Sequence, residues 1–226
     1  MPKVIKKRAE KKAHKEENIS ETVVDIRKKI KERQRTLVFS LIAFGAVLLL
    51  AGAFFIYNKT TTSKARELEY EGYKAFYGTG QAQTISPQER YKSALEKFKG
   101  SYAAKKNPVV LLYIANSYYE LGNYDEAVKT LQDLTKRYSD PKVVSLAYYK
   151  MAMAYESKND MPSALDALNK LAGIKDSPLQ DMALMESAHV LEVMGKAEEA
   201  KDKYKELVSK FPKSALADKA KARLGS

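Results

Sequence analysis

Residues 114–134 read IANSYYELGNYDEAVKTLQDL, and a related pattern follows twice more along the chain. Residues 151–171 read MAMAYESKNDMPSALDALNKL, and residues 187–207 read SAHVLEVMGKAEEAKDKYKEL. The alanines that the three copies share, Ala127, Ala164 and Ala200, lie 37 and 36 residues apart. A shorter match, RYKSALEKF at residues 90–98, places Ala94 33 residues before Ala127. A period of this length indicates an array of stacked structural repeats.

Each copy is predicted to form two antiparallel helices joined by a tight turn. The first helices are expected to begin close to prolines, which suit a first helical turn: Pro108, Pro141 and Pro178. They are expected to end at residues that adopt left-handed backbone conformations: Gly122, Asn159 and Gly195. In the second helices the shared alanine lets two helix axes approach closely, and apolar residues follow it at i+4 and i+7. The fold class is therefore all-α, a solenoid of about three and a half helix pairs.

The two ends of this array are predicted to differ from its middle. Residues 63–77 would supply the first helix of the opening pair, followed by a loop over residues 78–87 that is longer than the other turns. Residues 213–224, KSALADKAKARL, are expected to form a polar-faced helix that caps the open end.

The repeated positions resemble the tetratricopeptide repeat family over residues 91–212. The small, aromatic, glycine, tyrosine, alanine and bulky positions of that family's pattern match Ala115, Tyr118, Gly122, Tyr124, Ala127 and Leu131. The second copy departs from the pattern, because Asn159 replaces glycine and Met161 replaces tyrosine. The resemblance implies a concave face, formed by the first helices, that binds protein or peptide partners.

Repeat positions carried across one at a time give the residues expected to line this groove. They are Val109, Leu112, Asn116 and Tyr119, then Leu146, Tyr149, Met153 and Glu156, and finally Met182, Met185, His189 and Glu192. Adaptable apolar side chains with scattered polar ones suit an extended or helical peptide. The alternative for these positions is ordinary packing between repeats. Leu112 stands where family members that clamp a terminal carboxylate have a lysine, so that mode of binding is not expected.

Residues 37–57, LVFSLIAFGAVLLLAGAFFIY, carry no charge, although 30% of the whole chain is charged. A helix of 21 residues spans about 30 Å, the thickness of the hydrocarbon core of a bilayer. We therefore predict a single membrane-spanning helix that contacts lipid. The alternatives are a buried core helix and a signal peptide cleaved near the small residues Ala51, Gly52 and Ala53.

Basic residues set the predicted orientation of this helix. Within 15 residues of its two ends there are six before it and three after it: Arg27, Lys28, Lys29, Lys31, Arg33 and Arg35, against Lys59, Lys64 and Arg66. Basic flanks stay in the cytoplasm. The expected organisation is a basic cytoplasmic tail over residues 1–36 with a short amphipathic helix, a transmembrane helix over residues 37–57, and a periplasmic solenoid over residues 58–226.

The tail itself, from Pro2 to Lys15, is predicted to be disordered in isolation. The whole chain has a formal charge of +12, and residues 1–36 carry 13 basic against 6 acidic residues. Such a cluster also gains from anionic lipid headgroups. Binding of nucleic acid is not expected, since the tail has no interleaved aromatic residues and no recognisable binding module.

No catalytic constellation is found in the sequence. The chain has no cysteine, and its two histidines, His14 and His189, have no partner residues at the spacing of a metal or catalytic site. We expect no enzymatic activity, no metal and no cofactor.

A basic tail, one span and a short repeat array together resemble the bitopic inner-membrane ancillary subunits of the Sec translocon. The repeats are also similar to those of envelope-assembly lipoproteins, which lack a retained span. The resemblance implies a non-enzymatic adaptor, single-pass in the bacterial inner membrane, that meets periplasmic chaperones or the translocon. The alternative function is a cleaved, soluble periplasmic scaffold for envelope or cell-wall assembly.

Overall fold

The structure is a computed structural model that describes residues 3–225, with side chains described from residue 20 onward. Its regular structure is helical, and no strand occurs among these residues. The chain divides into two units, with the boundary between Lys59 and Thr60. All of the repeat pattern lies in the second unit, so the candidate site is built there.

Helix α1 (Lys3–Tyr77) is one continuous helix that runs through the first unit and into the second. The prediction of a disordered tail is wrong for residues 3–15, and Pro2 lies outside the described residues. The short amphipathic helix expected in the tail, over residues 18–30, was predicted to run into the apolar stretch, and these residues are helical within α1. Lysine, glutamate and alanine are strong helix formers, and no proline or glycine interrupts residues 3–44, so nothing in this stretch ends the helix.

The apolar stretch of residues 37–57 lies within α1, and its side chains are exposed on every side of the helix. Leu49, Phe54 and Leu50 are each more than two-thirds exposed. Among the described residues this is the one helix that is long and apolar enough to cross a membrane. The core-helix alternative is excluded within the described chain, because no part of the most apolar window is buried.

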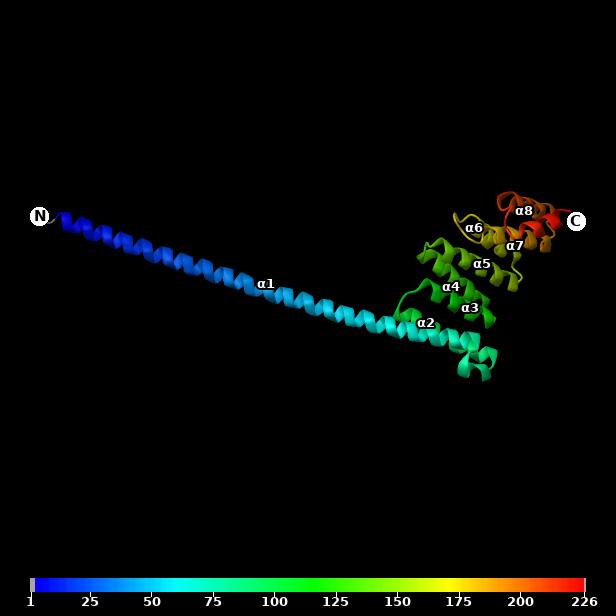
Figure 1. The fold of residues 1–226 in the computed structure, drawn as a ribbon, viewed down its shortest axis with the longest axis horizontal. Coiled ribbons are helices and arrows are strands. Elements are labelled where there is room, and N and C mark those ends of the chain that lie inside the picture. The colour runs from blue at the N-terminus through cyan, green and yellow to red at the C-terminus, as the bar shows by residue number, and fades with distance from the viewer. Residues whose placement is uncertain (1–2, 226) are drawn as a thin grey trace. The chain divides into compact units, whose positions relative to one another are not determined.

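The second unit is a stack of helix pairs that follow one another in chain order (Figure 1). The end of α1 pairs with α2 (Pro87–Ala104), and α3 (Pro108–Glu120) pairs with α4 (Tyr124–Arg137). Next come α5 (Pro141–Ser157) with α6 (Met161–Ala172), α7 (Gln180–Val193) with α8 (Ala197–Lys210), and finally α9 (Ala217–Leu224). The predicted all-α solenoid of repeated helix pairs is confirmed, with α9 as its last helix.

Four helix starts in the second unit, those of α2, α3, α5 and α6, are capped by a side chain that accepts a hydrogen bond from a free backbone N–H group. Asn107 accepts one from the N–H of Val109 at 3.0 Å, just before the proline that opens α3. Asp140 does the same for the first turn of α5. Helix α7 begins two residues after the predicted Pro178, because the hydroxyl of Ser177 accepts from the N–H of Leu179 and holds a turn there.

The turns inside the pairs have the left-handed residues that the sequence predicts. Gly122, Asn159 and Gly195 have φ angles of 75°, 60° and 76°. In the first of these turns the N–H of Asn123 donates to the carbonyl of Tyr118 at 2.9 Å, which closes the end of α3. The same closure recurs after α5 and α7. The short 3₁₀ helix η1 (Gly80–Thr84) fills the longer loop after α1.

Small residues at the helix crossings let each pair pack closely. The six alanines at these crossings are buried: Ala115, Ala127, Ala152, Ala164, Ala188 and Ala200. In the opening pair Gly72 takes this role, since a Cβ atom placed there would lie 2.6 Å from the fully buried ring of Phe98. The core therefore runs along the stack as two clusters, one from α1 to α6 that also includes Val190 of α7, and one from α7 to α9.

Candidate peptide-binding groove

The first helices of three successive pairs carry all twelve residues that the sequence assigned to the groove. They are Val109, Leu112, Asn116 and Tyr119 on α3; Leu146, Tyr149, Met153 and Glu156 on α5; and Met182, Met185, His189 and Glu192 on α7. Val109, Met153 and His189 are exposed, and the others except Leu112 are half-buried.

Leu112 does not offer a surface to a partner. Its side chain is 4% exposed and belongs to the core cluster that joins α1 to α6. Leu146 and Tyr149 are partly buried against the same cluster, and Met185 against the second one. Leu112 is therefore a packing residue of the core. Leu146, Tyr149 and Met185 pack against the core but keep part of their side chains exposed to solvent.

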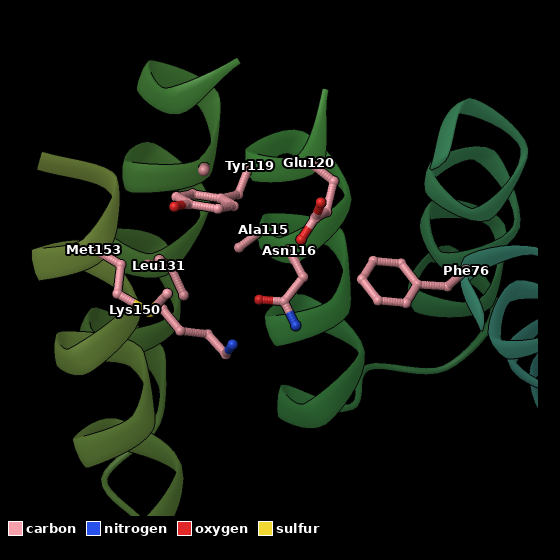
Figure 2. A pocket seen from close by; sticks show the side chains of 9 residues that line it. Phe76, Ala115, Asn116, Tyr119, Glu120, Leu131, Lys150 and Met153 are labelled. Carbon is pink, nitrogen blue, oxygen red and sulfur yellow. The ribbon is translucent and has the colours of Figure 1, made fainter. Parts of the chain in front are cut away.

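A cavity of about 230 Å³ lies between α3 and α5 and brings together three of the predicted residues, Asn116, Tyr119 and Met153. Figure 2 shows their side chains directed into the same space. Its remaining lining residues are Phe76, Ala115, Glu120, Ala127, Leu131 and Lys150. We call this space the α3–α5 cavity. Phe76, Glu120 and Lys150 were not predicted from the sequence as residues of this site.

Tyr119 is held firmly at the rim of the α3–α5 cavity. Its hydroxyl shares a hydrogen bond of 2.9 Å with the hydroxyl of Ser157, which ties α3 to α5. Its ring lies 5.3 Å from the ring of Tyr124, with the two planes tilted by 59°. An aromatic side chain fixed in this way offers a preorganised apolar surface to a ligand.

Lys150 gives the cavity its cation. The side chain points into the space beside Asn116, across from Phe76 (Figure 2). Burial lowers the pKa of Lys150, and the carboxylate of Glu120 partly opposes that effect. No described residue forms a hydrogen bond or an ion pair with its ammonium group. A half-buried ammonium next to a side-chain amide can bind a carbonyl or carboxylate oxygen, while Phe76, Leu131 and Met153 offer apolar contact.

Between α5 and α7 the same face becomes acidic. Burial raises the pKa of Glu156, the nearby Glu186 adds to the rise, and His189 opposes it. Burial also raises the pKa of Tyr149, again with contributions from Glu186 and Glu156. His189 Nδ1 lies 4.0 Å from a carboxylate oxygen of Glu192. The groove thus changes from an α3–α5 section with both a cation, Lys150, and an anion, Glu120, to an acidic α5–α7 section.

Two residues of this face that were not predicted, Lys150 of the cavity and Glu186 of the acidic section, could have been identified from the sequence. Lys150 is the single charged residue between Lys142 and Glu156, in an otherwise apolar stretch. Because burial of an unpaired charge costs free energy, a lysine at such a position is a candidate binding residue. Glu186 stands one position after the predicted Met185. Phe76 carried no such signal, because it comes from α1, a helix that no repeat position relates to the cavity.

The described residues hold no group of three or more His, Asp or Glu side chains arranged to bind a metal ion. The chemistry of this face is that of binding: a fixed aromatic edge, an unpaired ammonium, an amide, and apolar walls.

Two sequence models described as tetratricopeptide repeat match the chain, one over residues 88–147 and the other over residues 146–173 and 183–214. Together they cover more than half of the 226 residues. The chain is a tetratricopeptide repeat protein. Proteins with this fold generally act as protein-interaction adaptors and scaffolds rather than as enzymes.

Solved structures agree on the fold. A putative kinesin light chain from Podosopora anserina with nearly identical TPR-like repeats matches with a TM-score of 0.54 and 15% identity, over 71% of this chain and 84% of that chain. The apo form of RapI matches with a TM-score of 0.52 and 15% identity, over 71% and 58%. The MamA protein matches with a TM-score of 0.50 and 19% identity, over 72% and 85%. No curated protein matches the sequence significantly.

Proposed function

We propose that this protein is a membrane-anchored, non-enzymatic adaptor. In this proposal residues 37–57 cross the bacterial inner membrane once, residues 1–36 lie in the cytoplasm, and the solenoid of residues 58–226 lies on the periplasmic side. The groove on α3, α5 and α7 binds a protein segment, with the Sec translocon or a periplasmic chaperone as the partner that the family resemblance implies.

The observation that carries the proposal is the exposed apolar segment of α1, which leads within a few residues into the first helix of the solenoid. An apolar helix surface of this extent is stable in lipid, where a helix satisfies its own backbone hydrogen bonds. The excess of basic residues before the segment supports the cytoplasmic side for the tail.

Anchoring in a membrane also allows a groove of low affinity to bind its partner. A tethered site meets partners in the same membrane at a high effective concentration, so a modest intrinsic affinity is enough. The α3–α5 cavity is small and open to one side chain or chain end rather than to a folded domain, which supports a short peptide segment as the ligand.

Topology is tested with alkaline phosphatase, which is active only outside the cytoplasm. A fusion after Ser226 should be active, and a fusion after Arg35, before the span, should be inactive. Activity of the Arg35 fusion together with silence of a well-expressed Ser226 fusion would reverse the proposed orientation.

The cleaved periplasmic scaffold remains a second candidate because Ala51, Gly52 and Ala53 fit a processing site. Mass spectrometry of the mature protein separates the two. An N-terminus at Met1 or Pro2, with the protein in the membrane fraction, supports the anchored form; an N-terminus near Phe54 supports the scaffold.

Partner binding is tested by a matched pair of variants of the full-length chain in detergent. Met153→Glu places a carboxylate in the α3–α5 cavity, whereas Ala197→Glu places one on the exposed first turn of α8. We expect Met153→Glu to reduce recovery of a crosslinked partner by about tenfold, which is the effect of ~1.4 kcal/mol, and Ala197→Glu to leave it unchanged. Equal recovery with both variants and the parent chain contradicts binding at this cavity.

A further inference from the structure

A second cleft, separate from the groove, lies at the start of the solenoid. It has a volume of about 290 Å³ and is formed by α1, the end of α2 and the first residue of α3. Its lining residues are Thr62, Ala65, Arg66, Glu69, Ser101, Lys105, Lys106, Asn107 and Pro108. We call it the α1–α2 cleft.

The α1–α2 cleft carries three cations and one carboxylate. Arg66, Lys105 and Lys106 are exposed, and none of the three forms an ion pair with a described residue. The carboxylate, Glu69, already accepts a hydrogen bond of 2.7 Å from the hydroxyl of Tyr73. The cleft therefore has an excess of positive charge that the solenoid itself does not neutralise.

Two of the three cations, Lys105 and Lys106, are each held by a contact with a neighbouring side chain. The ammonium group of Lys105 donates a hydrogen bond of 2.9 Å to the hydroxyl of Thr62, which ties the end of α2 to α1. Lys106 lies with its ammonium group 4.2 Å from the centre of the Tyr102 ring. Arg66 lines the cleft one turn of α1 beyond Thr62. A guanidinium fork, two ammonium groups and a hydroxyl around one cleft are suited to the oxygens of a phosphate.

Chain length alone keeps this cleft close to the apolar segment. Thr62 is five residues after Tyr57, the last residue of the apolar stretch. Even a fully extended chain of five residues reaches only ~18 Å. If residues 37–57 span a bilayer, Lys105 and its neighbours lie at the level of the lipid headgroups or just beyond them.

We propose that the α1–α2 cleft binds the phosphate group of anionic phospholipids, so that the first helix pair of the solenoid docks on the bilayer surface. This proposal rests on the membrane anchoring proposed above. The ligand chemistry is that of a phosphate, and its source is the headgroup of a neighbouring lipid rather than a free anion in solution.

The chain offers a direct reporter because it contains no cysteine. Ala103 is exposed on α2 two residues before Lys105, so Ala103→Cys gives one site for a polarity-sensitive fluorophore. The labelled full-length chain is placed in nanodiscs of phosphatidylcholine alone, or with part of it replaced by phosphatidylglycerol. We expect a blue shift of the emission in the anionic discs only, and we expect high salt to remove it.

Two double variants separate the cleft from general surface charge. Lys105→Glu with Lys106→Glu should abolish the blue shift, whereas Lys175→Glu with Lys213→Glu, the same charge change at exposed positions elsewhere on the solenoid, should retain it. Equal melting temperatures by circular dichroism confirm that both variants fold. The salt dependence of the labelled parent chain tests the proposal without any charge substitution.

Each other outcome is decisive. The same spectrum in neutral and anionic discs overturns the proposal while leaving the anchoring intact. A blue shift in neutral discs on addition of inorganic phosphate assigns the cleft to free phosphate and overturns the lipid as its ligand. A chain that does not enter the discs at all contradicts the anchoring itself, which distinguishes that failure from the failure of the cleft.

Discussion

Lys150 and Glu156 lie on the same helix, and both bear a charge that the fold partly removes from water. Their pKa values move in opposite directions because the charged form is a cation in one and an anion in the other. Neither shift is compensated by a strong partner within the described chain. Both residues therefore reduce the stability of the free protein, which is typical of side chains kept for binding.

We predict that Lys150→Met stabilises the fold and lowers the affinity for the partner. The pKa of Lys150 in the folded state lies below the ordinary lysine value of 10.5, so the parent chain gains stability as the pH rises through the interval between the two values. Methionine removes the buried charge at similar length, and the melting temperature at pH 7 should rise by about 2–4 °C.

Lys142→Met is the control for this change, because Lys142 is exposed at the start of the same helix. Thermal melts between pH 7 and 10 should show a smaller gain with pH in Lys150→Met than in the parent or the control. A lower melting temperature in Lys150→Met would mean that Lys150 has a stabilising partner in solution.

For Glu156 the sign is reversed. Its pKa in the folded state is raised, so the folded chain binds more protons than the unfolded one between the unfolded value of 4.5 and the raised value. Stability contributed by protonated Glu156 is present at acidic pH and is lost as the pH rises through that interval. Glu156→Gln should therefore raise the melting temperature at pH 7 by about 1–3 °C and remove this part of the pH dependence.

Melts between pH 4 and 7 measure this effect, with Glu96→Gln as the control at an exposed position on α2. A pH profile of Glu156→Gln that coincides with that of the parent would show that Glu186 and His189, the two neighbours of Glu156, are the groups responsible for any slope in this range.

At the scale of the helices, the turn residues decide how each pair closes. Gly122 and Asn159 occupy equivalent positions with φ angles of 75° and 60°. A Cβ atom added at Gly122 would contact nothing within 4 Å, so Gly122→Ala introduces backbone strain alone. We predict a loss of about 1–2 kcal/mol for Gly122→Ala and a gain of about 0.5 kcal/mol for Asn159→Gly.

Urea unfolding measures both, and the slope of the transition should stay the same. Gly173→Ala is the matched control, because Gly173 ends α6 with a φ angle of −79°, which alanine adopts readily. A Gly122→Ala chain as stable as Gly173→Ala would contradict the role of the left-handed turn.

The starts and ends of the helices could be predicted from the sequence where proline or a left-handed residue determines them. Prolines at residues 108 and 141 mark the starts of α3 and α5 because proline suits a first turn, and the left-handed residues mark the ends. The start of α7 lies two residues after Pro178, close to the predicted position, because the turn at Ser177 precedes the helix. The helical state of residues 3–15 was not predicted, because their high polarity was interpreted as disorder, although lysine, glutamate and alanine favour a helix.

The candidate site was predictable only in part for a related reason. A repeat pattern tells which helix face a residue occupies, and three of the residues it assigned to the groove, Asn116, Tyr119 and Met153, line the α3–α5 cavity. It does not tell how far a neighbouring helix covers that face, so Leu112 was assigned to the groove although it is buried. The domain boundaries and the binding role of the remaining positions stay predictions.

For the solenoid as a whole, α9 closes the second core cluster. Ala217 and Ala220 are buried against α7 and α8, and Leu224 packs at the edge of the same cluster. We predict that truncation after Pro212 lowers the melting temperature by about 5–10 °C and promotes self-association, because an uncapped solenoid end exposes apolar surface.

Calorimetry and light scattering of the full-length and shortened chains test this prediction, with truncation after Leu224 as the control. If the chain ending at Pro212 has the same melting temperature as the control, α9 adds nothing to the stability of the second cluster.

Packing between sequential neighbours has a kinetic consequence. From α2 onward each helix packs mainly on the helix before it and the helix after it, with α3 and α5 as an additional pair. Contacts are thus short in sequence separation, which favours fast folding. The opening pair encloses Phe98 before α9 has been synthesised, so folding can advance along the chain as it emerges. During synthesis such a chain exposes the unpaired face of its last folded helix, and the small area of this apolar surface limits aggregation.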